Sequence, residues 1–318
     1  MAGIDLNRTS SGVSDLLPKE ISSEIWANAV NESIIMSASR GVSLPGGGLT
    51  IPMITGDAEA DWVNETDEKP VSDATVGSKS MTPYKLAVIE TFSNEFRRDL
   101  PALYAELARR LPSALGRKFD ATVVNGTAPG SNFDVLTNAD TQVVDATDTI
   151  EDLAAALQAV SVANGDLSHW LIAPQLEGTV RLAKDPGTGS YAFLSDARND
   201  NGSIGSIFGR QVLKSNAVYA AGDPNVVGLA GDFARSAVYG TVEGIEVAIS
   251  DTATVNKGGT QLNLWQRNMF AIRAEVEVGF IVRDEAHFVK LVVSWFGGMT
   301  VPGESTFLGV STFPTGGN

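Results

Sequence analysis

Apolar and polar residues alternate strictly near the end of the chain. In IRAEVEVGF, residues 272–280, every second side chain is apolar, and the positions between hold an arginine, two glutamates and a glycine. Successive side chains of a strand point to opposite faces, so this period of two predicts a strand with one buried face. We expect AHFVKLVVS, residues 286–294, to be its partner strand, reached through a turn around Arg283 and Asp284.

A period close to 3.6 residues predicts helices. Leucines recur at this spacing in DLPALYAELARRLPSALGRKFDATVVNG, residues 99–126, where Asp99 is a suitable N-cap and Gly126 ends the pattern. Pro112 removes a backbone donor inside this helix, so we expect a kink there. A shorter helix is predicted to begin at Pro18 and to run through PKEISSEIWANAVNES, residues 18–33.

The segment between these helices favours extended structure. LTIPMI and SKSMTPYKLAVIETFS are rich in β-forming residues, and polar residues lie between them. We predict one long hairpin over residues 49–92. Its apolar residues, including Trp62 and Val63, are spread thinly, and an isolated two-stranded hairpin is marginal in water. The hairpin therefore needs another surface to lie on.

A second region is predicted to begin near residue 145. Asp148 followed by Glu151 suggests a capping box at the start of a helix that Gly165 ends. SHWLIAP, residues 168–174, is typical of a buried strand, and QLEGTVRLA, residues 175–183, of a helix. The remaining expected elements are a glycine-rich loop over residues 184–206 and strands over residues 210–216, 225–233, 237–242 and 245–250.

Composition narrows the functional classes. The chain has 318 residues, of which 43% are hydrophobic, and its 23 basic and 38 acidic residues give a formal charge of −15. Such acidity argues against sequence-independent binding of nucleic acid, which requires clustered Lys and Arg. Without cysteine there are no disulfides, thiolate nucleophiles or cysteine-based zinc sites. The sequence also shows no signal peptide and no apolar run of membrane-spanning length.

Motifs of catalysis are missing from the sequence. The only histidines are His169 and His287, which we interpret as structural or surface residues. HExxH, the P-loop pattern, G-x-S-x-G and a strand-linked G-x-G-x-x-G are absent. The loop over residues 186–190 (PGTGS) lacks the lysine and helix start of a phosphate site, which favours a surface or pore loop. We therefore predict no enzyme activity, no cofactor and no metal site.

Pairs of cationic residues lie before and along the long predicted helix. Arg97 and Arg98 precede it, and the pairs Arg109–Arg110 and Arg117–Lys118 lie within it. One interpretation is a solvated helix face. The other is a row of cations that meets acidic groups of a neighbouring subunit, because the remainder of the chain is so acidic.

The order of motifs resembles the major capsid proteins of tailed bacteriophages, which have the Hong Kong 97 fold. The resemblance rests on A-x-W-V-x-E…KP in the hairpin, KLAVIETFSNEFRRD, RKFDATVVNG and RAEVEVGFIV…AHFVKL, and it covers residues 18–295. It implies an α+β fold with an N-terminal arm, an extended hairpin loop, a peripheral domain with a long spine helix, and an axial domain. The implied boundaries are 1–48 for the arm, 49–92 for the extended loop, 93–135 and 255–295 for the peripheral domain, 136–254 for the axial domain and 296–318 for a C-terminal tail.

The resemblance also implies a function. The chain would assemble with itself into hexamers and pentamers of an icosahedral shell that encloses double-stranded phage DNA. Another implied partner is a portal. Since the chain starts almost directly at the arm, we expect a separate scaffold protein or none, and a decoration protein is an open alternative. The implied location is the virion, after assembly in the host cytoplasm.

The resemblance places specific residues at contacts between subunits. Residues near the symmetry axes would be Asp185, Pro186, Gly187 and Gly189. Trp62 would pack between its hairpin and the next subunit, where a tryptophan buries roughly 150–250 Å², equivalent to roughly 4–6 kcal/mol before entropy costs. The full set of predicted inter-subunit residues is Trp62, Val63, Glu65, Lys69, Pro70, Arg97, Arg98, Arg109 and Arg110.

Two alternatives to the phage shell stay open at this point. One keeps the fold but makes the chain an encapsulin-type compartment shell that holds enzymes. The other is an enzyme or ligand-binding protein of mixed α/β type, which would be a monomer or a small oligomer. Some relatives cross-link a hairpin lysine to an asparagine of a neighbour. Lys69 and Lys79 are the hairpin lysines here, but no motif identifies a partner asparagine, so we do not expect cross-linking.

Overall fold

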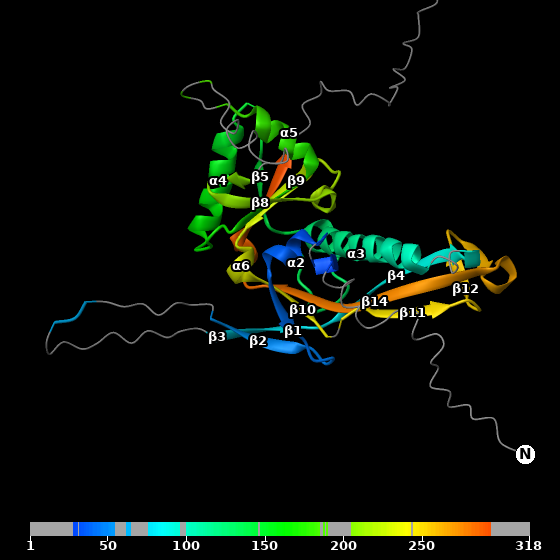
Figure 1. Ribbon diagram of the computed structural model, residues 1–318. Helices are drawn as coiled ribbons and strands as arrows, with labels where there is room; N and C mark the ends of the chain where they lie inside the picture. Colours follow the sequence, from blue (N-terminus) through cyan, green and yellow to red (C-terminus); the bar gives the residue numbers. More distant parts are fainter. Residues whose placement is uncertain are drawn as a thin grey trace, which may run out of the picture.

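The computed structural model has a mixed α and β architecture with two main sheets (Figure 1). At positions 53, 54, 76, 100–109 and 112 only the backbone is described. The residues that the structure describes are 28–30, 32–54, 62–64, 76–95, 100–145, 147–184, 187, 189, 205–242 and 244–293.

The alternating strand is the centre of the first sheet. β14 (Met269–Val282) buries the apolar residues of its alternating segment and exposes Arg273, which confirms the predicted period of two. The strands β10 (Ala237–Thr241) and β11 (Glu246–Ser250) pair with successive halves of one edge of β14, and β4 (Tyr84–Ser93) pairs with its other edge. The short β1 (Arg40–Ser43) then pairs in parallel with β10.

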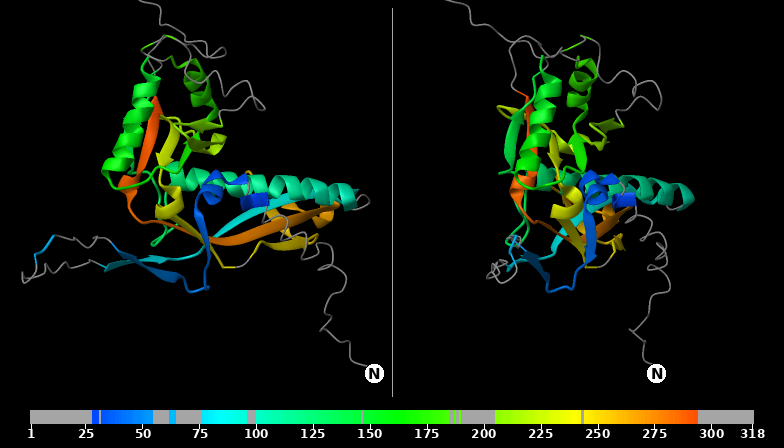
Figure 2. Two further views of the ribbon diagram at one scale, coloured as in Figure 1. Left: turned by 60° about the vertical axis from the view of Figure 1, so that its left-hand side comes forward. Right: turned by 90° about the vertical axis from the view of Figure 1, so that its left-hand side faces the viewer.

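The spine helix covers the buried face of this sheet. α3 (Leu100–Asn125) stops before Gly126, as predicted, and includes Pro112, where the expected kink stays a prediction. Leu111 and Leu115 pack with the first half of β14 and with β4. Phe119 packs edge-to-face on Phe280 of the second half of β14, with ring centroids 6.0 Å apart. Figure 2 shows the helix lying along the strand. The short helix α2 (Ile34–Ala38) closes the core beside α3.

The hairpin is shorter than expected. β2 (Leu49–Ile54) pairs with β3 (Val76–Met81), from Leu49 opposite Met81 to Ile54 opposite Val76. The prediction that pairing continues to residue 92 is wrong, because the chain breaks at Thr82–Pro83 and β4 joins β14 instead. The alternating apolar residues of β4 pack in the core formed by α3 and β14, a burial that a two-stranded ribbon cannot supply.

The second sheet contains the last strand of the described chain. Its order is β5–β15–β9–β6–β8–β7. The prediction that residues 286–294 pair with β14 is wrong, because β15 lies between β5 and β9. The sheet's strands are β5 (Asp140–Val143), β15 (Phe288–Val293), β9 (Asn225–Gly231), β6 (His169–Ile172), β8 (Arg210–Lys214) and β7 (Ser206–Ile207).

Two helices pack on the second sheet. α4 (Thr149–Val162) and α5 (Pro174–Leu182) contribute Leu153, Val160 and Leu176 to a core around Trp170, whose indole N–H donates to the Ile207 carbonyl at 3.1 Å.

The predicted capping box of α4 does not form. Asp148 is the N-cap residue but its side chain accepts no capping bond. The first turn is held from Asp145 instead, whose backbone N–H donates to Asp152 Oδ2 at 2.7 Å and whose carbonyl accepts from Thr149 Oγ1 at 2.7 Å.

Smaller elements complete the described part of the chain. In Figures 1 and 2 the second sheet stands at one end of the α3–β14 layer, and β2 and β3 extend on the side away from β12. The helix expected over residues 18–33 lies mostly outside the described residues, and 28–30 and 32 are helical. The remaining elements are β12 (Thr254–Lys257), β13 (Thr260–Asn263), α6 (Phe233–Ser236) and the 3₁₀ turns Asn216–Val218, Trp265–Arg267 and Glu285–His287.

Sheet membership does not follow the expected domain boundaries. β10 and β11 lie within 136–254, yet they belong to the sheet of β14. β15 lies within 255–295, yet it belongs to the second sheet. The chain therefore crosses between the sheets more often than the four-part division implies, and that division stays a prediction.

Candidate functional site

The hairpin carries the most exposed tryptophan among the described residues. Figure 1 shows β2 and β3 extending from the layer and the short segment 62–64 lying beyond their open end. The side chain of Trp62 is 100% exposed and that of Val63 is 43% exposed. Tryptophan is enriched at protein interfaces because it offers a large apolar area with few rotamers. The predicted contacts Glu65, Lys69 and Pro70 lie outside the described residues.

A methionine anchors the base of the hairpin. Met81 is fully buried and packs with Leu44 and Ile281. It lies over Gly240 and Gly279, which face each other across β10 and β14. A Cβ atom at Gly240 would lie 2.8 Å from the Met81 sulfur, and one at Gly279 would lie 2.7 Å from Met81 Cγ. The two glycines therefore form a space that Met81 fills together with Leu44, whose side chain lies even closer than the Met81 sulfur to a Cβ atom at Gly240.

A lysine provides a second attachment. Lys79 Nζ donates to Asp134 Oδ2 at 2.7 Å and to the Val282 carbonyl at 2.8 Å. The Val282 backbone N–H donates to the same Asp134 oxygen at 3.0 Å. The side chains of Lys79 and Asp134 are 39% and 23% exposed. We call Lys79, Met81 and Asp134 the hairpin foot.

The predicted row of cations is described only in part. Arg97 and Arg98, and the side chain of Arg109, lie outside the described residues. Arg110 Nη1 lies 3.6 Å from Glu90 Oε1 on β4, within the same chain. Its guanidinium is thus engaged on the sheet beneath α3, and its contact with a neighbouring subunit stays a prediction.

The loop expected near the symmetry axes is also partly described. Asp185 and Pro186 lie outside the described residues, whereas Gly187 and Gly189 are exposed. Gly189 has φ +65, a backbone conformation that favours glycine. Its position relative to other subunits stays a prediction.

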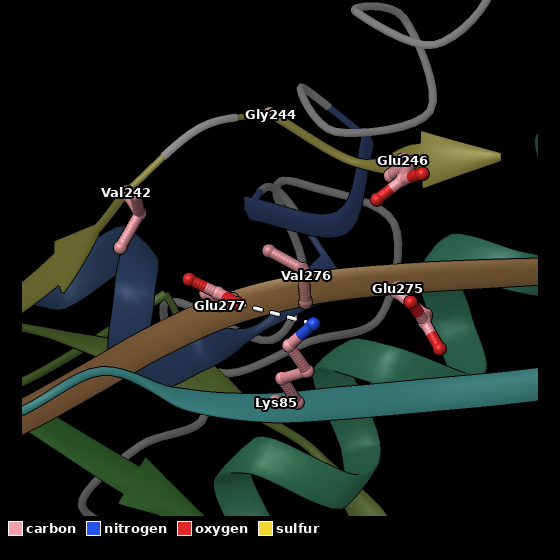
Figure 3. Close-up of a pocket in the computed structure, with 7 residues that line it drawn as sticks. All are labelled: Lys85, Val242, Gly244, Glu246, Glu275, Val276 and Glu277. Carbon is pink, nitrogen blue, oxygen red and sulfur yellow. Dashed lines mark ion pairs between the residues drawn. The ribbon is translucent and has the colours of Figure 1, made fainter. Parts of the chain in front are cut away.

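An acidic surface pocket of about 250 Å³ lies where β4, β14 and the start of β11 meet (Figure 3). Glu246 stands directly opposite Glu275 in the ladder. Lys85 Nζ lies 3.4 Å from Glu277 Oε1, and Arg273 Nε lies 3.2 Å from Glu275 Oε1. Two of the three carboxylates are thus paired with cations. The residues that line the pocket are Lys85, Val242, Gly244, Glu246, Glu275, Val276 and Glu277.

A buried carboxylate ties α2 to α3. Asp120 Oδ1 accepts from Ser33 Oγ at 2.6 Å and from the Ile35 N–H at 3.4 Å, and Oδ2 accepts from the Ile34 N–H at 3.1 Å. Burial raises the pKa of Asp120 to about 6, against the opposing effect of these hydrogen bonds. The carboxylate thereby satisfies backbone donors at the start of α2 that the helix itself cannot.

The histidines have structural surroundings. His287 is buried, with Nδ1 against Ser236 Oγ and Nε2 3.0 Å from the Ala163 carbonyl. His169 contacts Ser168 Oγ, and burial lowers its pKa. Among the described residues, no group of three or more His, Asp or Glu side chains could hold a metal ion. None of the described helices is long and apolar enough to cross a membrane.

Comparison with known proteins decides the family. A family model described as the phage capsid family matches residues 13–293. The chain belongs to the phage capsid family. It is 33% identical over 293 residues to the probable major capsid protein gp17 of Mycobacterium phage L5. The matched region covers 86% of this chain and 88% of that protein. The members are structural shell proteins of bacteriophages, and the family is not a class of enzymes.

Solved structures show the same fold. A chain from Gordonia phage Cozz has a TM-score of 0.64 and 23% identity, with 83% of this chain and 87% of that chain covered. A chain from the capsid of an empty GTA particle with C5 symmetry has a TM-score of 0.61 and 15% identity, with 83% and 90% covered. The resemblance to major capsid proteins is confirmed, and these matches do not favour the encapsulin alternative.

The hairpin foot could not be recognised from the sequence. The sequence marks Lys79 only as one of the hairpin lysines. The partners Asp134 and Val282 are separated from it by 55 and 203 positions. Two glycines in strands give no signal of facing each other until the register of β10 and β14 is known. A methionine directly before Thr82–Pro83 was the one local hint.

Proposed function

We propose that this chain forms the hexamers and pentamers of an icosahedral shell that encloses the double-stranded DNA of a phage. Membership of the phage capsid family supports this, since its members build virion shells. The C5 symmetry with which the capsid of one structural neighbour was computed supports the pentamers. The formal charge of −15 suits a container that holds DNA without binding its sequence.

The hairpin is proposed to contact the next subunit. The observation that carries this proposal is the 100% exposure of Trp62 at the far end of a ribbon that leaves the body of the chain. Burial of its side chain against a neighbour would contribute roughly 4–6 kcal/mol before the cost of ordering the loop. The same contact recurs around a closed symmetric shell, so a modest net energy at each copy stabilises the whole.

The remaining partners follow from the same role. We propose a portal and a separate scaffold protein during assembly in the host cytoplasm, and we leave a decoration protein as an alternative. The four-part division into arm, extended loop, peripheral domain and axial domain belongs to this proposal. The cations of the α3 region, together with the acidic surface, would then contribute ionic contacts between subunits.

Expression of the chain and examination of purified material test the proposal. We expect sedimentation of large particles and electron micrographs of closed shells with five-fold and six-fold units. Particles from infected cells should hold nuclease-resistant DNA. A compact monomer at all concentrations would refute the proposal, and shells that hold other proteins instead of DNA would favour the compartment alternative.

A tryptophan pair tests the hairpin contact. Trp62→Ala should leave the free subunit folded and lower the yield of shells. Trp265→Ala is the matched control, because Trp265 is 73% exposed but lies in a turn of the main body. Equal loss of shells in both variants, or unfolding of the Trp62→Ala subunit, would contradict a specific role for the hairpin.

A further inference from the structure

We propose that the hairpin foot sets the direction in which the hairpin leaves the body, so that Lys79, Met81 and Asp134 are positioning residues for shell assembly. This inference rests on the proposed function, in which the hairpin contacts a neighbouring subunit. None of the three residues lies at the exposed end of the hairpin. They would act on that end through the base.

The hairpin needs such a device because no sheet ladder holds it. β2 and β3 form a two-stranded sheet of their own, and within the described residues neither strand pairs with β14 or β10. The ribbon is joined to the body through its two chain ends, at one of which the Thr82 N–H donates to the Asn132 carbonyl at 3.2 Å, and it can pivot about these ends. Its direction must therefore come from side-chain contacts at the base.

The inner face of β3 supplies these contacts at two points. Lys79 and Met81 are two residues apart, so both side chains point to the same face, while Ser78 and Ser80 are exposed on the other. Met81 fills the space over Gly240 and Gly279. Lys79 reaches Asp134 and the Val282 carbonyl at 2.7 and 2.8 Å. Two separate attachments along one strand oppose rotation, whereas either alone would serve as a pivot.

Asp134 is itself held in place. Its Oδ2 accepts both from Lys79 Nζ and from the Val282 backbone N–H at 3.0 Å. Its own backbone N–H donates to the Phe280 carbonyl at 2.9 Å. The carboxylate is thus fixed to the end of β14, and the ammonium of Lys79 binds to a rigid acceptor.

A small rotation at the base of the hairpin produces a large displacement of its far end. Val76 is five residues from Met81 along β3, which at about 3.3 Å per residue is roughly 16 Å. A rotation of about 10° at Met81 would then move Val76 by roughly 3 Å, more than a packed contact tolerates. The displacement grows towards the exposed end that carries Trp62.

Spin labels on the free subunit measure this direction. The chain has no cysteine, so Asn64→Cys at the far end of the hairpin and Lys118→Cys on α3 give one defined pair of labels. Both positions are exposed. Pulsed electron paramagnetic resonance then reports the distribution of distances between them. The variants are Lys79→Met and Asp134→Asn, and Lys79→Arg is the conservative variant.

Lys85→Met is the matched control, because it removes the same charge from β4, where Lys85 pairs with Glu277 outside the hairpin. We expect Lys79→Met and Asp134→Asn to widen the distance distribution at least twofold, and Lys79→Arg and Lys85→Met to leave it narrow. We also expect the two widening variants to lower shell yield about fivefold or more while far-ultraviolet circular dichroism stays unchanged.

The outcomes separate the inference from the proposed function. A distribution that is equally broad in the original chain and in Lys79→Met would overturn the inference, whatever the shells do. Widening without any loss of shells would support the positioning role and count against the hairpin as an assembly contact. Widening of the distance distribution in Lys85→Met as well would show a general effect of charge and would refute the positioning role of the hairpin foot.

Discussion

Replacement of Ser33 by alanine should weaken the attachment of α2 to the spine helix in a pH-dependent way. Ser33 Oγ donates to the buried Asp120 carboxylate at 2.6 Å and accepts from the Met36 N–H at 3.1 Å as the N-cap of α2. Both groups of the Ser33–Asp120 pair are fully buried. Alanine removes both hydrogen bonds without adding volume, so the decrease in the free energy of unfolding measures the contribution of the Ser33 hydroxyl.

The magnitude depends on the charge of Asp120. A hydrogen bond to a charged group contributes about 1.5–3 kcal/mol, and a neutral one about 0.5–1.5 kcal/mol. Loss of the N-cap adds about 1 kcal/mol in either state. We therefore expect Ser33→Ala to lower the free energy of unfolding by about 2.5–4 kcal/mol when Asp120 is ionised. When Asp120 is protonated the loss should be about 1.5–2.5 kcal/mol.

The direction of the pH dependence follows from the raised pKa. Asp120 binds its proton with a pKa of about 6 in the folded chain against 3.8 as the ordinary value. The folded state therefore holds the proton at pH values where the unfolded state has lost it. Its stabilising contribution is full below 3.8 and is lost as the pH rises through 6, a change of about 3 kcal/mol. Without the Ser33 hydroxyl the pKa should rise further.

Urea denaturation of the unassembled chain at pH 5 and pH 8 measures both effects. Ser37→Ala is the matched control, since Ser37 lies on the same helix but its hydroxyl donates to the Ile34 carbonyl and does not contact Asp120. We expect the destabilisation by Ser33→Ala to be about 1 kcal/mol larger at pH 8 than at pH 5. An equal effect at both pH values, or an effect no larger than that of Ser37→Ala, would refute the reasoning.

Three further outcomes can be checked directly. Gly279→Ala should lower the free energy of unfolding by about 1–3 kcal/mol in urea denaturation, because the new Cβ would lie 2.7 Å from Met81 Cγ; an unchanged midpoint would mean that Met81 can move aside. Trp62→Ala should leave the unfolding free energy of the free subunit within about 0.5 kcal/mol of the original, as expected for an exposed site. Shell yield should change between low and high salt, since exposed ionic contacts are screened over about 8–10 Å at physiological ionic strength; a flat yield by light scattering would argue against an ionic contribution.

Local pattern predicted the single elements well. The alternation over residues 272–280 predicted β14, and the leucine spacing predicted α3 with its end at Gly126, because each pattern needs only one buried face. The same reasoning failed for pairing. It joined β15 to β14 and extended the hairpin to residue 92, since neighbours in sequence are the first candidates for neighbours in space.

The sequence also predicted part of the candidate site and missed another part. The sequence marks Trp62 as a large apolar side chain in a polar segment, and this side chain is 100% exposed in the single chain. The capping box predicted at Asp148 was wrong, since the Asp148 side chain makes no capping bond and the first turn is held by hydrogen bonds to the Asp145 backbone.

By itself the sequence determined the periodic elements, the acidic and cysteine-free character, and the ordered motifs that mark a phage capsid protein. Only the tertiary structure decided that Lys79 meets Asp134 and that Met81 fills the space between Gly240 and Gly279. The physical reason is the separation along the sequence between the residues that interact. A buried face repeats every two or 3.6 residues and can be read locally, whereas the register of two distant strands depends on every contact formed between them.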